Sequence, residues 1–225
     1  MKPRTGHAAM GRLLEGAVAL VTGAGRGIGR AHALALAHAG AAVVVNDLGG
    51  DFRGEGAGDA APANEVVAQI RAAGGRAVAD AGNVADWEST RRMVDSAISV
   101  FGKLDIVVNN AGICRFATVD AMTPRDWDLQ IAVNLTGTAT VSHWAARYWR
   151  SLGPHPGRAI INTSSPAGTN PVTGSPAYCA SKAAVAALTI AAAAELADLG
   201  VRVNAIAPMA RTRMTLAVAA HDEVL

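Results

Sequence analysis

The chain has 225 residues, of which 51% are hydrophobic and 17% are charged. This length and composition suffice for one well-buried core and predict a single globular domain. The formal net charge of +2 is too small to predict a nucleic-acid-binding surface. Two cysteines and six histidines show no metal-ligand spacing, so we expect no metal site.

Two segments bear on membrane targeting. Residues 1–12 are polar and slightly basic, so they predict a flexible N-terminal tail rather than a signal peptide. The longest apolar run, Ala183 to Ala194, is short for a membrane span and is bounded by Lys182 and Glu195. It predicts a buried or interface helix. We therefore expect a soluble, cytoplasmic protein without a membrane span.

From residue 13 onward, short β-branched runs alternate with longer alanine-rich stretches, which is typical of α/β proteins with a parallel sheet. The predicted strands are Val18–Thr22, Ala42–Asp47, Arg76–Ala79, Ile106–Asn109, Ala159–Thr163 and Arg202–Ile206. The predicted helices are Gly27–Ala39, Pro62–Ala73, Trp87–Phe101, Pro124–Ser151 and Pro176–Leu199. We expect a Rossmann-type, doubly wound parallel sheet in three layers, forming one domain over residues 13–225.

The stretch Leu48 to Ala61 is rich in glycine and aspartate and predicts a long polar loop. A solvated insertion is at least as good an interpretation of it as a substrate contact.

A glycine-rich run, Thr22 to Gly29, follows the first predicted strand and opens the first predicted helix. This is the context that a dinucleotide-binding site requires. Its glycines let the backbone turn tightly and approach a pyrophosphate, whose charge suits a helix N-terminus. The candidate cofactor-binding residues here are Gly23, Arg26, Gly27, Ile28 and Gly29.

Asp47 ends the second predicted strand, at about the spacing where an acidic residue meets the adenosine ribose hydroxyls. Its carboxylate would repel a 2′-phosphate, which favours NAD over NADP. Arg26 has the opposite effect, because an arginine in the glycine run can accept extra phosphate charge. We weight Asp47 more, since its position at the strand end directs it at the ribose.

The fourth predicted strand ends in the tetrapeptide Asn109-Asn110-Ala111-Gly112. Its small residues let the backbone pass close to the adenosine ribose. A simple turn is an alternative interpretation of this tetrapeptide. The candidate cofactor-binding residues are Asn110, Ala111 and Gly112.

Tyr178 and Lys182 are four residues apart, which places them on one face of a helix. There an ammonium group can favour the phenolate and make tyrosine useful as an acid or base near neutral pH. Ser165 lies thirteen residues before the tyrosine. Each of these features is common alone, but their order along the chain indicates a hydride-transfer site.

Together these motifs resemble the short-chain dehydrogenase/reductase family, in that family's order, from about Leu14 to Met214. The glycine spacing resembles the short single-domain branch. The resemblance implies that Tyr178 is the general acid/base and that Lys182 lowers its pKa and binds the nicotinamide ribose. It also implies that Ser165, rather than the adjacent Ser164, holds the substrate oxygen.

The same resemblance implies further site residues. Asn134 matches the asparagine that kinks the long helix and supports a water chain to the lysine; a local bond to the backbone is an equally good interpretation. Asn83 and Val84 stand where an aspartate usually meets the adenine ring. Pro208 begins the segment that covers the nicotinamide, and Thr212 is expected to contact the carboxamide or a phosphate.

Two departures from the family pattern concern the C-terminal part. Met209 stands where the family usually has a glycine, which alters the path of the loop toward Thr212. The chain stops at Leu225, where the family normally continues with another helix and a final strand. We expect these two elements to be missing from this sequence, so that either the natural protein is longer or this copy lacks them.

Two segments carry a closer likeness, Asn46–Phe52 and Ile206–Thr215. Both resemble the D-3-hydroxyacyl-CoA dehydrogenase unit of peroxisomal multifunctional enzymes and its bacterial relatives. It implies a 3-hydroxyacyl thioester as substrate, with a steroid or other hydrophobic alcohol as the alternative. A non-catalytic NAD(H)-binding sensor or scaffold is the alternative from another class, and an inactive fragment is a third. The helix with Trp144 and Trp149 and the helix after Lys182 resemble the family's subunit-pairing faces, which implies a homo-oligomer.

Overall fold

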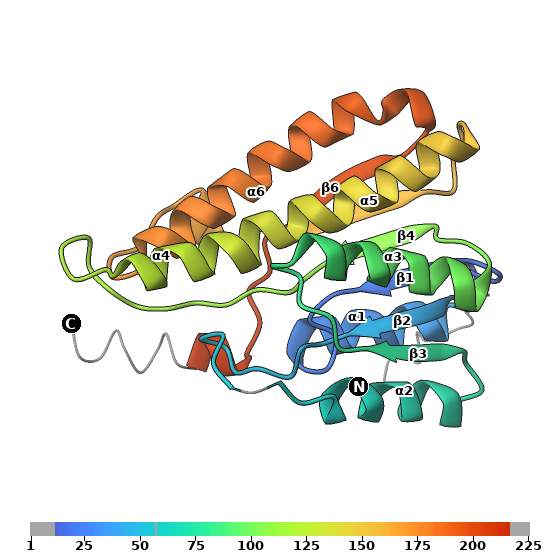
Figure 1. Ribbon diagram of the computed structural model, residues 1–225, viewed down its shortest axis with the longest axis horizontal. Coiled ribbons are helices and arrows are strands. Elements are labelled where there is room, and N and C mark those ends of the chain that lie inside the picture. Colours follow the sequence, from blue (N-terminus) through green and yellow to red (C-terminus); the bar gives the residue numbers. More distant parts are fainter. Residues whose placement is uncertain (1–11, 57, 217–225) are drawn as a thin grey trace, which may run out of the picture.

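The computed structural model describes residues 12–56 and 58–216, and these form a six-stranded parallel sheet with helices on both faces (Figure 1). The strand order is β3-β2-β1-β4-β5-β6. The chain leaves β1 first toward one edge of the sheet and then, from β4 onward, toward the other. The strands are β1 (Val18–Val21), β2 (Ala42–Asn46), β3 (Ala77–Asp80), β4 (Ile106–Asn109), β5 (Ala159–Thr163) and β6 (Arg202–Ile206). This confirms the predicted doubly wound α/β sheet, in which ligands bind at the carboxyl ends of the strands near the change of direction.

The helices form one layer on each face of the sheet (Figure 1). The layer that includes α1 (Gly27–His38) and α2 (Ala61–Ala72) packs on β1 to β4. The opposite layer contains α3 (Trp87–Phe101), α5 (Gly137–Leu152) and α6 (Pro176–Glu195). Shorter elements are α4 (Pro124–Gln130), the π-helical η1 (Ile131–Thr136), η2 (Pro166–Gly168) and η3 (Ala197–Leu199).

Strand alternation divides the core into two apolar clusters. In β1, Val18 and Leu20 pack toward α3 and α5, while Ala19 and Val21 pack toward α1 and α2. All four are fully buried, because a parallel strand covered on both faces has no polar side. Trp149 on α5 is also buried and donates its indole N–H to the carbonyl oxygen of Leu104, 2.7 Å away.

The helix predicted over residues 124–151 is interrupted. It consists of α4, the π-helical turn η1 and α5, because η1 inserts one extra residue into the turn that carries Asn134. The last predicted helix ends at Glu195 instead of Leu199. A 3₁₀ turn follows, and Gly200, with a φ of +70°, ends it.

Helix α6 is long and apolar enough to cross a membrane by length and composition alone. This is weak evidence for a span, because core helices of soluble proteins pass the same test. Its buried residues face the sheet and include Lys182 and Thr189. The predicted tail, residues 1–12, lies outside the described residues except for Arg12.

Candidate active site

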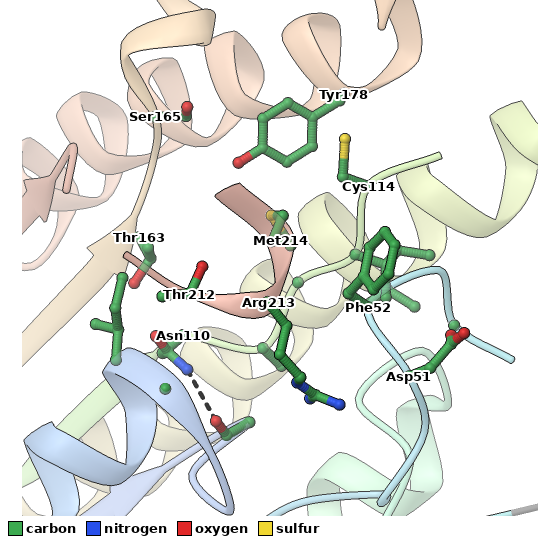
Figure 2. A pocket seen from close by; sticks show the side chains of 18 of the residues that line it. Asp51, Phe52, Asn110, Cys114, Thr163, Ser165, Tyr178, Thr212, Arg213 and Met214 are labelled. Atoms are coloured by element: carbon green, nitrogen blue, oxygen red, sulfur yellow. Dashed lines mark hydrogen bonds between the residues drawn. The ribbon is translucent and has the colours of Figure 1, made fainter. Parts of the chain in front are cut away.

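A cavity of about 1140 Å³ lies at the carboxyl edge of the sheet, where β1, β2, β4 and β5 end. It exceeds the usual volume of a small-ligand pocket, which is about 300–1,000 Å³, so it has room for a dinucleotide together with a substrate. The 48–56 loop and residues 208–216 complete its walls. Figure 2 shows side chains from several of these segments directed into this space.

The glycine run forms the floor at one end of the cavity. Gly23 and Gly27 have φ values of +60° and +55°, which suit glycine. A Cβ on Gly29 would overlap the carbonyl oxygen of Gly23, so this position also needs a glycine. No side chain of the described residues caps the N-terminus of α1, which leaves its N–H groups available to an anion. Ile28 and Arg26 line the same end.

Asp47 lies beside the glycine run, and its carboxylate also fixes the backbone of that run. Its Oδ2 accepts a 2.7 Å hydrogen bond from the N–H of Gly25, and its Oδ1 accepts one of the same length from Gly49. The carboxylate lines the cavity with unused lone pairs, so it can still accept from a ribose hydroxyl.

Asn110 ties the end of β4 to the glycine run. Its side-chain Nδ2 donates to the carbonyl oxygens of Thr22 and Gly23, both 3.0 Å away. The Thr22 hydroxyl accepts from the backbone N–H groups of Asn110 and Ala111. Asn110 therefore fixes the shape of the cofactor end through its side chain, and it lines the cavity together with Ala111 and Gly112.

Asn83 and Val84 line the cavity after β3. The Asn83 side-chain oxygen accepts from the N–H of Ala85, 2.9 Å away, while the residue itself stays exposed. Val84 is buried and packs against Gly137, where a Cβ would lie 2.9 Å from a Val84 methyl group. Both residues are therefore held in place at this edge of the cavity.

Tyr178 lies in the cavity, with its hydroxyl directed toward the centre (Figure 2). Burial raises the pKa of this phenol above its usual value, while a hydrogen bond with the Ser165 side chain opposes that rise. The structure therefore brings the predicted serine and tyrosine together. Burial is the largest influence on the tyrosine pKa, and Lys182 is not among the groups that shift it. The expected lowering of this pKa by Lys182 is therefore not found.

Lys182 is almost completely buried, with 4% exposure. Burial lowers the pKa of its ammonium group from 10.5 to about 8. Its Nζ donates to the carbonyl oxygen of Thr163, 2.8 Å away, and lies 5.8 Å from the centre of the Tyr178 ring. A buried cation without a carboxylate partner among the described residues is costly, which is typical of functional sites.

Asn134 is fully buried in η1 and does not bond only to its own helix. Its side chain accepts from the N–H of Ile113 at 2.8 Å and donates to the Ile113 carbonyl at 3.0 Å. It also donates to the hydroxyl of Ser181, 3.1 Å away, on α6. Asn134 thus joins the chain after β4 to the helix that carries Tyr178 and Lys182.

Pro208 and Thr212 lie on the segment that covers the glycine run. A Cβ on Gly27 would lie 3.7 Å from the methyl group of Thr212. The Thr212 hydroxyl also accepts from the N–H of Thr215, 3.3 Å away, so this residue begins a short helical turn. Thr212 therefore lies close to the expected phosphates.

Sequence reasoning missed Thr163 as a site residue. The residue lines the cavity (Figure 2), and its hydroxyl is buried without a hydrogen-bond partner among the described residues. The uncapped N-terminus of α1 and the open glycine run fit a nicotinamide dinucleotide, and Thr163 lines the same cavity. Its position at the end of the fifth strand was the available signal.

Sequence reasoning also left the role of the 48–56 loop undecided. The loop lines the cavity, and its Phe52 carbonyl accepts from the N–H of Cys114, 2.9 Å away. Burial raises the pKa of the Cys114 thiol to about 12, so this side chain remains a neutral part of the wall. The loop is thus a wall of the cavity, although most of its residues are also exposed to solvent.

Comparison with known proteins agrees with this arrangement. The profile of the family described as short chain dehydrogenase matches residues 17–223. A crystal structure of a short chain dehydrogenase from Mycobacterium avium is 49% identical, with a TM-score of 0.83. The match covers 90% of this chain and 70% of that one.

Two curated relatives carry more specific names. Peroxisomal multifunctional enzyme type 2 of Mus musculus is 42% identical over 210 residues, which are 93% of this chain and 28% of that protein. The hydroxyacyl-CoA dehydrogenase ChsB1 of Mycobacterium tuberculosis is 44% identical over 212 residues, which are 90% of this chain and 63% of that protein. The chain therefore spans less than two thirds of either relative.

Proposed function

Because the chain belongs to the short chain dehydrogenase family, we propose that it is an NAD(H)-dependent oxidoreductase that interconverts a secondary alcohol and a ketone. The observation that carries this proposal is that Tyr178, Ser165 and the buried Lys182 line one cavity with the uncapped N-terminus of α1. A proton donor and an anion-binding site thus share one chamber.

The protein groups have distinct parts in this reaction. A bound nicotinamide would supply the hydride donor or acceptor. In alcohol oxidation Tyr178 takes the hydroxyl proton as the carbon loses its hydride, and in reduction it returns that proton to the carbonyl oxygen. Ser165 holds this oxygen with a second hydrogen bond. Lys182 uses one of its three N–H donors on Thr163 and can direct another at the cofactor ribose.

The position of Asp47 supports NAD(H) rather than NADP(H). Its carboxylate lies beside Gly25 at the cofactor end, where a 2′-phosphate would meet its negative charge. Arg26 lines the same end and would favour that phosphate. Asp47 is held by two backbone hydrogen bonds, and its fixed position is the reason for weighting it more.

We propose a 3-hydroxyacyl thioester as the substrate class. The name of the relative hydroxyacyl-CoA dehydrogenase ChsB1 supports it, and so does the apolar wall of the cavity beyond Tyr178. The exposed Arg211 and Arg213 line the cavity, and Figure 2 shows Arg213 reaching into it, where it suits the phosphates of a coenzyme A thioester. A steroid or other hydrophobic alcohol is the alternative substrate.

We propose that the protein is a homo-oligomer in the cytoplasm. The outer face of α6 is apolar and exposed; Ile190 is 74% exposed, and alanines extend this face along the helix. Both described cysteines are free thiols, which suits a reducing compartment. Sedimentation analysis and cell fractionation test these two points.

Substitution Tyr178→Phe tests the proposed activity. It removes the proton donor while keeping the ring, so we expect turnover of 3-hydroxyacyl-CoA to fall by about 10²- to 10⁴-fold with NADH affinity preserved. The matched control is Tyr148→Phe, which alters the chain's other tyrosine, on α5, and is expected to keep full activity. Turnover preserved in the Tyr178 variant would overturn the acid/base assignment. A wild-type protein that binds NADH but turns over no alcohol would support the sensor or scaffold alternative.

A further inference from the structure

Arg115 connects three parts of the chain next to the cavity. Its Nε donates to Asp126 Oδ1 at 2.6 Å, on α4. Its Nη1 donates to the Glu55 carboxylate at 3.0 Å and to the carbonyl oxygen of Arg53 at 3.1 Å. Its backbone N–H donates to the side chain of Gln130, 3.1 Å away. The side chains of Arg115 and Asp126 are only 16% and 17% exposed, so this is a partly buried ion pair with restricted geometry.

The Asp126 end of this connection is itself fixed. Thr123 caps α4, and its hydroxyl and backbone N–H both donate to Asp126 Oδ2, at 2.6 and 3.2 Å. These Thr123 hydrogen bonds, with the one from Arg115, lower the pKa of the Asp126 carboxyl to about 2. The carboxylate stays ionised at any working pH.

The loop held by Arg115 is folded in its own right. Asp51 Oδ1 accepts from the N–H groups of Arg53 and Glu55, each at 2.8 Å. Gly54 packs so closely on the neighbouring wall that a Cβ there would lie 3.0 Å from Ile113 and 3.1 Å from Leu129. The loop therefore meets the rest of the protein as a formed unit.

This unit places Phe52 in the wall of the cavity. Phe52 is partly buried, and Figure 2 shows it on the Cys114 side of the cavity. The Phe52 carbonyl bond to Cys114 and the Arg115 bonds hold the loop at two adjacent residues of the chain after β4. The surrounding wall is apolar and is formed by Ile113, Cys114, Phe116, Leu129 and Val133.

We propose that Arg115 is a positioning residue for the substrate: it holds the 48–56 loop so that Phe52 closes the apolar wall against the chain of the substrate. This inference rests on the proposed dehydrogenase function. Arg115 does not line the main cavity, so it acts through the loop. Because the wall contacts more of a longer chain, the effect of Arg115 on apparent substrate affinity grows with chain length.

The test uses Arg115→Gln, which keeps a polar side chain but loses the charge, and Phe52→Ala. For a long 3-hydroxyacyl-CoA we expect KM to rise about tenfold in both variants, with kcat within about twofold of wild type. For a short one both constants are expected to change little, and NADH affinity is unchanged. Arg115→Lys restores part of the lost affinity. The matched control is Arg91→Gln, which removes two exposed ion pairs on α3, with Glu88 and with Asp95.

A fall in kcat that is equal for short and long substrates, or a parallel loss of NADH binding, would overturn the proposal. A second measurement is independent of turnover. Trypsin cleaves after arginine, and Arg53 lies in the loop, so we expect cleavage there to become faster in Arg115→Gln and not in Arg91→Gln. Unchanged cleavage would also overturn it. If wild type turns over no 3-hydroxyacyl-CoA of any length, the proposed function fails, and the cleavage rates still decide whether Arg115 holds the loop.

Discussion

At the scale of the residue, the site keeps one charge, the Lys182 ammonium, in a costly position. Lys182 is a buried ammonium held by one carbonyl oxygen, and Tyr178 is a buried phenol with a raised pKa. Burial of the lysine costs stability because it disfavours the charged form, whereas the phenol stays neutral at pH 7 and carries no such cost. A chain selected only to fold would fill the position of Lys182 with an apolar side chain, which supports the proposed function of this residue.

Lys182→Met is expected to stabilise the ligand-free protein at pH 7 while abolishing activity. The lysine pKa is lowered from 10.5 to about 8, so the unfolded chain binds the proton more readily. The penalty is complete below about pH 8 and disappears as the pH rises toward 10.5. Loss of the Thr163 hydrogen bond offsets part of the gain, leaving roughly 1 to 3 kcal/mol.

Thermal or urea unfolding at pH 7 and at pH 9.5 measures this effect. The advantage of the methionine variant is expected to shrink at the higher pH. A variant that is less stable than wild type at pH 7, or that shows the same difference at both values, would contradict the assignment of Lys182 as a strained buried cation.

At the scale of the element, Asn134 links η1 to the chain after β4. We expect Asn134→Ala to destabilise the protein by about 2 kcal/mol, because the buried N–H of Ile113 loses its acceptor. We also expect activity to fall under conditions in which the variant is still folded, since the same side chain bonds to Ser181, next to Lys182. Chemical denaturation and steady-state kinetics measure the two effects. Asn134→Asp keeps an acceptor for the Ile113 N–H but loses the donor to the Ile113 carbonyl and to Ser181, so it separates the accepted hydrogen bond from the donated ones.

Most of the elements could be predicted from the sequence. A parallel strand buried on both faces is a short apolar run, so the sequence predicts β1, β2 and β4 to within a residue. Tyr178 and Lys182 were recognisable because their spacing fits one helix face. Both patterns are local in the sequence, so they do not depend on contacts with distant segments.

Other features depend on contacts between distant segments and could not be predicted. The 48–56 loop is polar in composition, and only the pairing of Arg115 with Glu55 and Asp126 reveals that it forms a wall. Similarly, the side-chain hydrogen bonds from Asn110 to the carbonyl oxygens of Thr22 and Gly23 join segments far apart in the sequence, and its contact with the cofactor stays a prediction. The raised pKa of Tyr178 is also a property of burial, which no spacing reports.

At the scale of the whole molecule, the cavity joins the two halves of the sheet. The glycine run and Asp47 belong to the β1–β3 half, while Tyr178 and Lys182 belong to the β4–β6 half. Residues 208–216 cross back from β6 to the glycine run. A dinucleotide that contacts both halves would therefore bind only the folded chain and stabilise it as a whole.

A thermal-shift titration with NADH and NADPH tests this coupling and the cofactor preference together. At about one hundred times the Kd, NADH should add about 2.7 kcal/mol. For a domain of this size, that raises the Tm by roughly 5–10 °C. NADPH should need a higher concentration for the same shift, because its 2′-phosphate meets the Asp47 carboxylate.

Asp47→Asn provides the control for charge. It keeps a similar shape and one acceptor oxygen for the Gly25 or Gly49 N–H, but it removes the negative charge from the ribose site. We expect the ratio of the NADPH to the NADH dissociation constant to fall by about tenfold in this variant. A wild-type preference for NADPH would mean that Arg26 outweighs Asp47. An unchanged ratio in the variant would show that the carboxylate charge does not set the preference. In either case the glycine run would still bind the pyrophosphate, because the uncapped N–H groups of α1 carry no preference between the two dinucleotides.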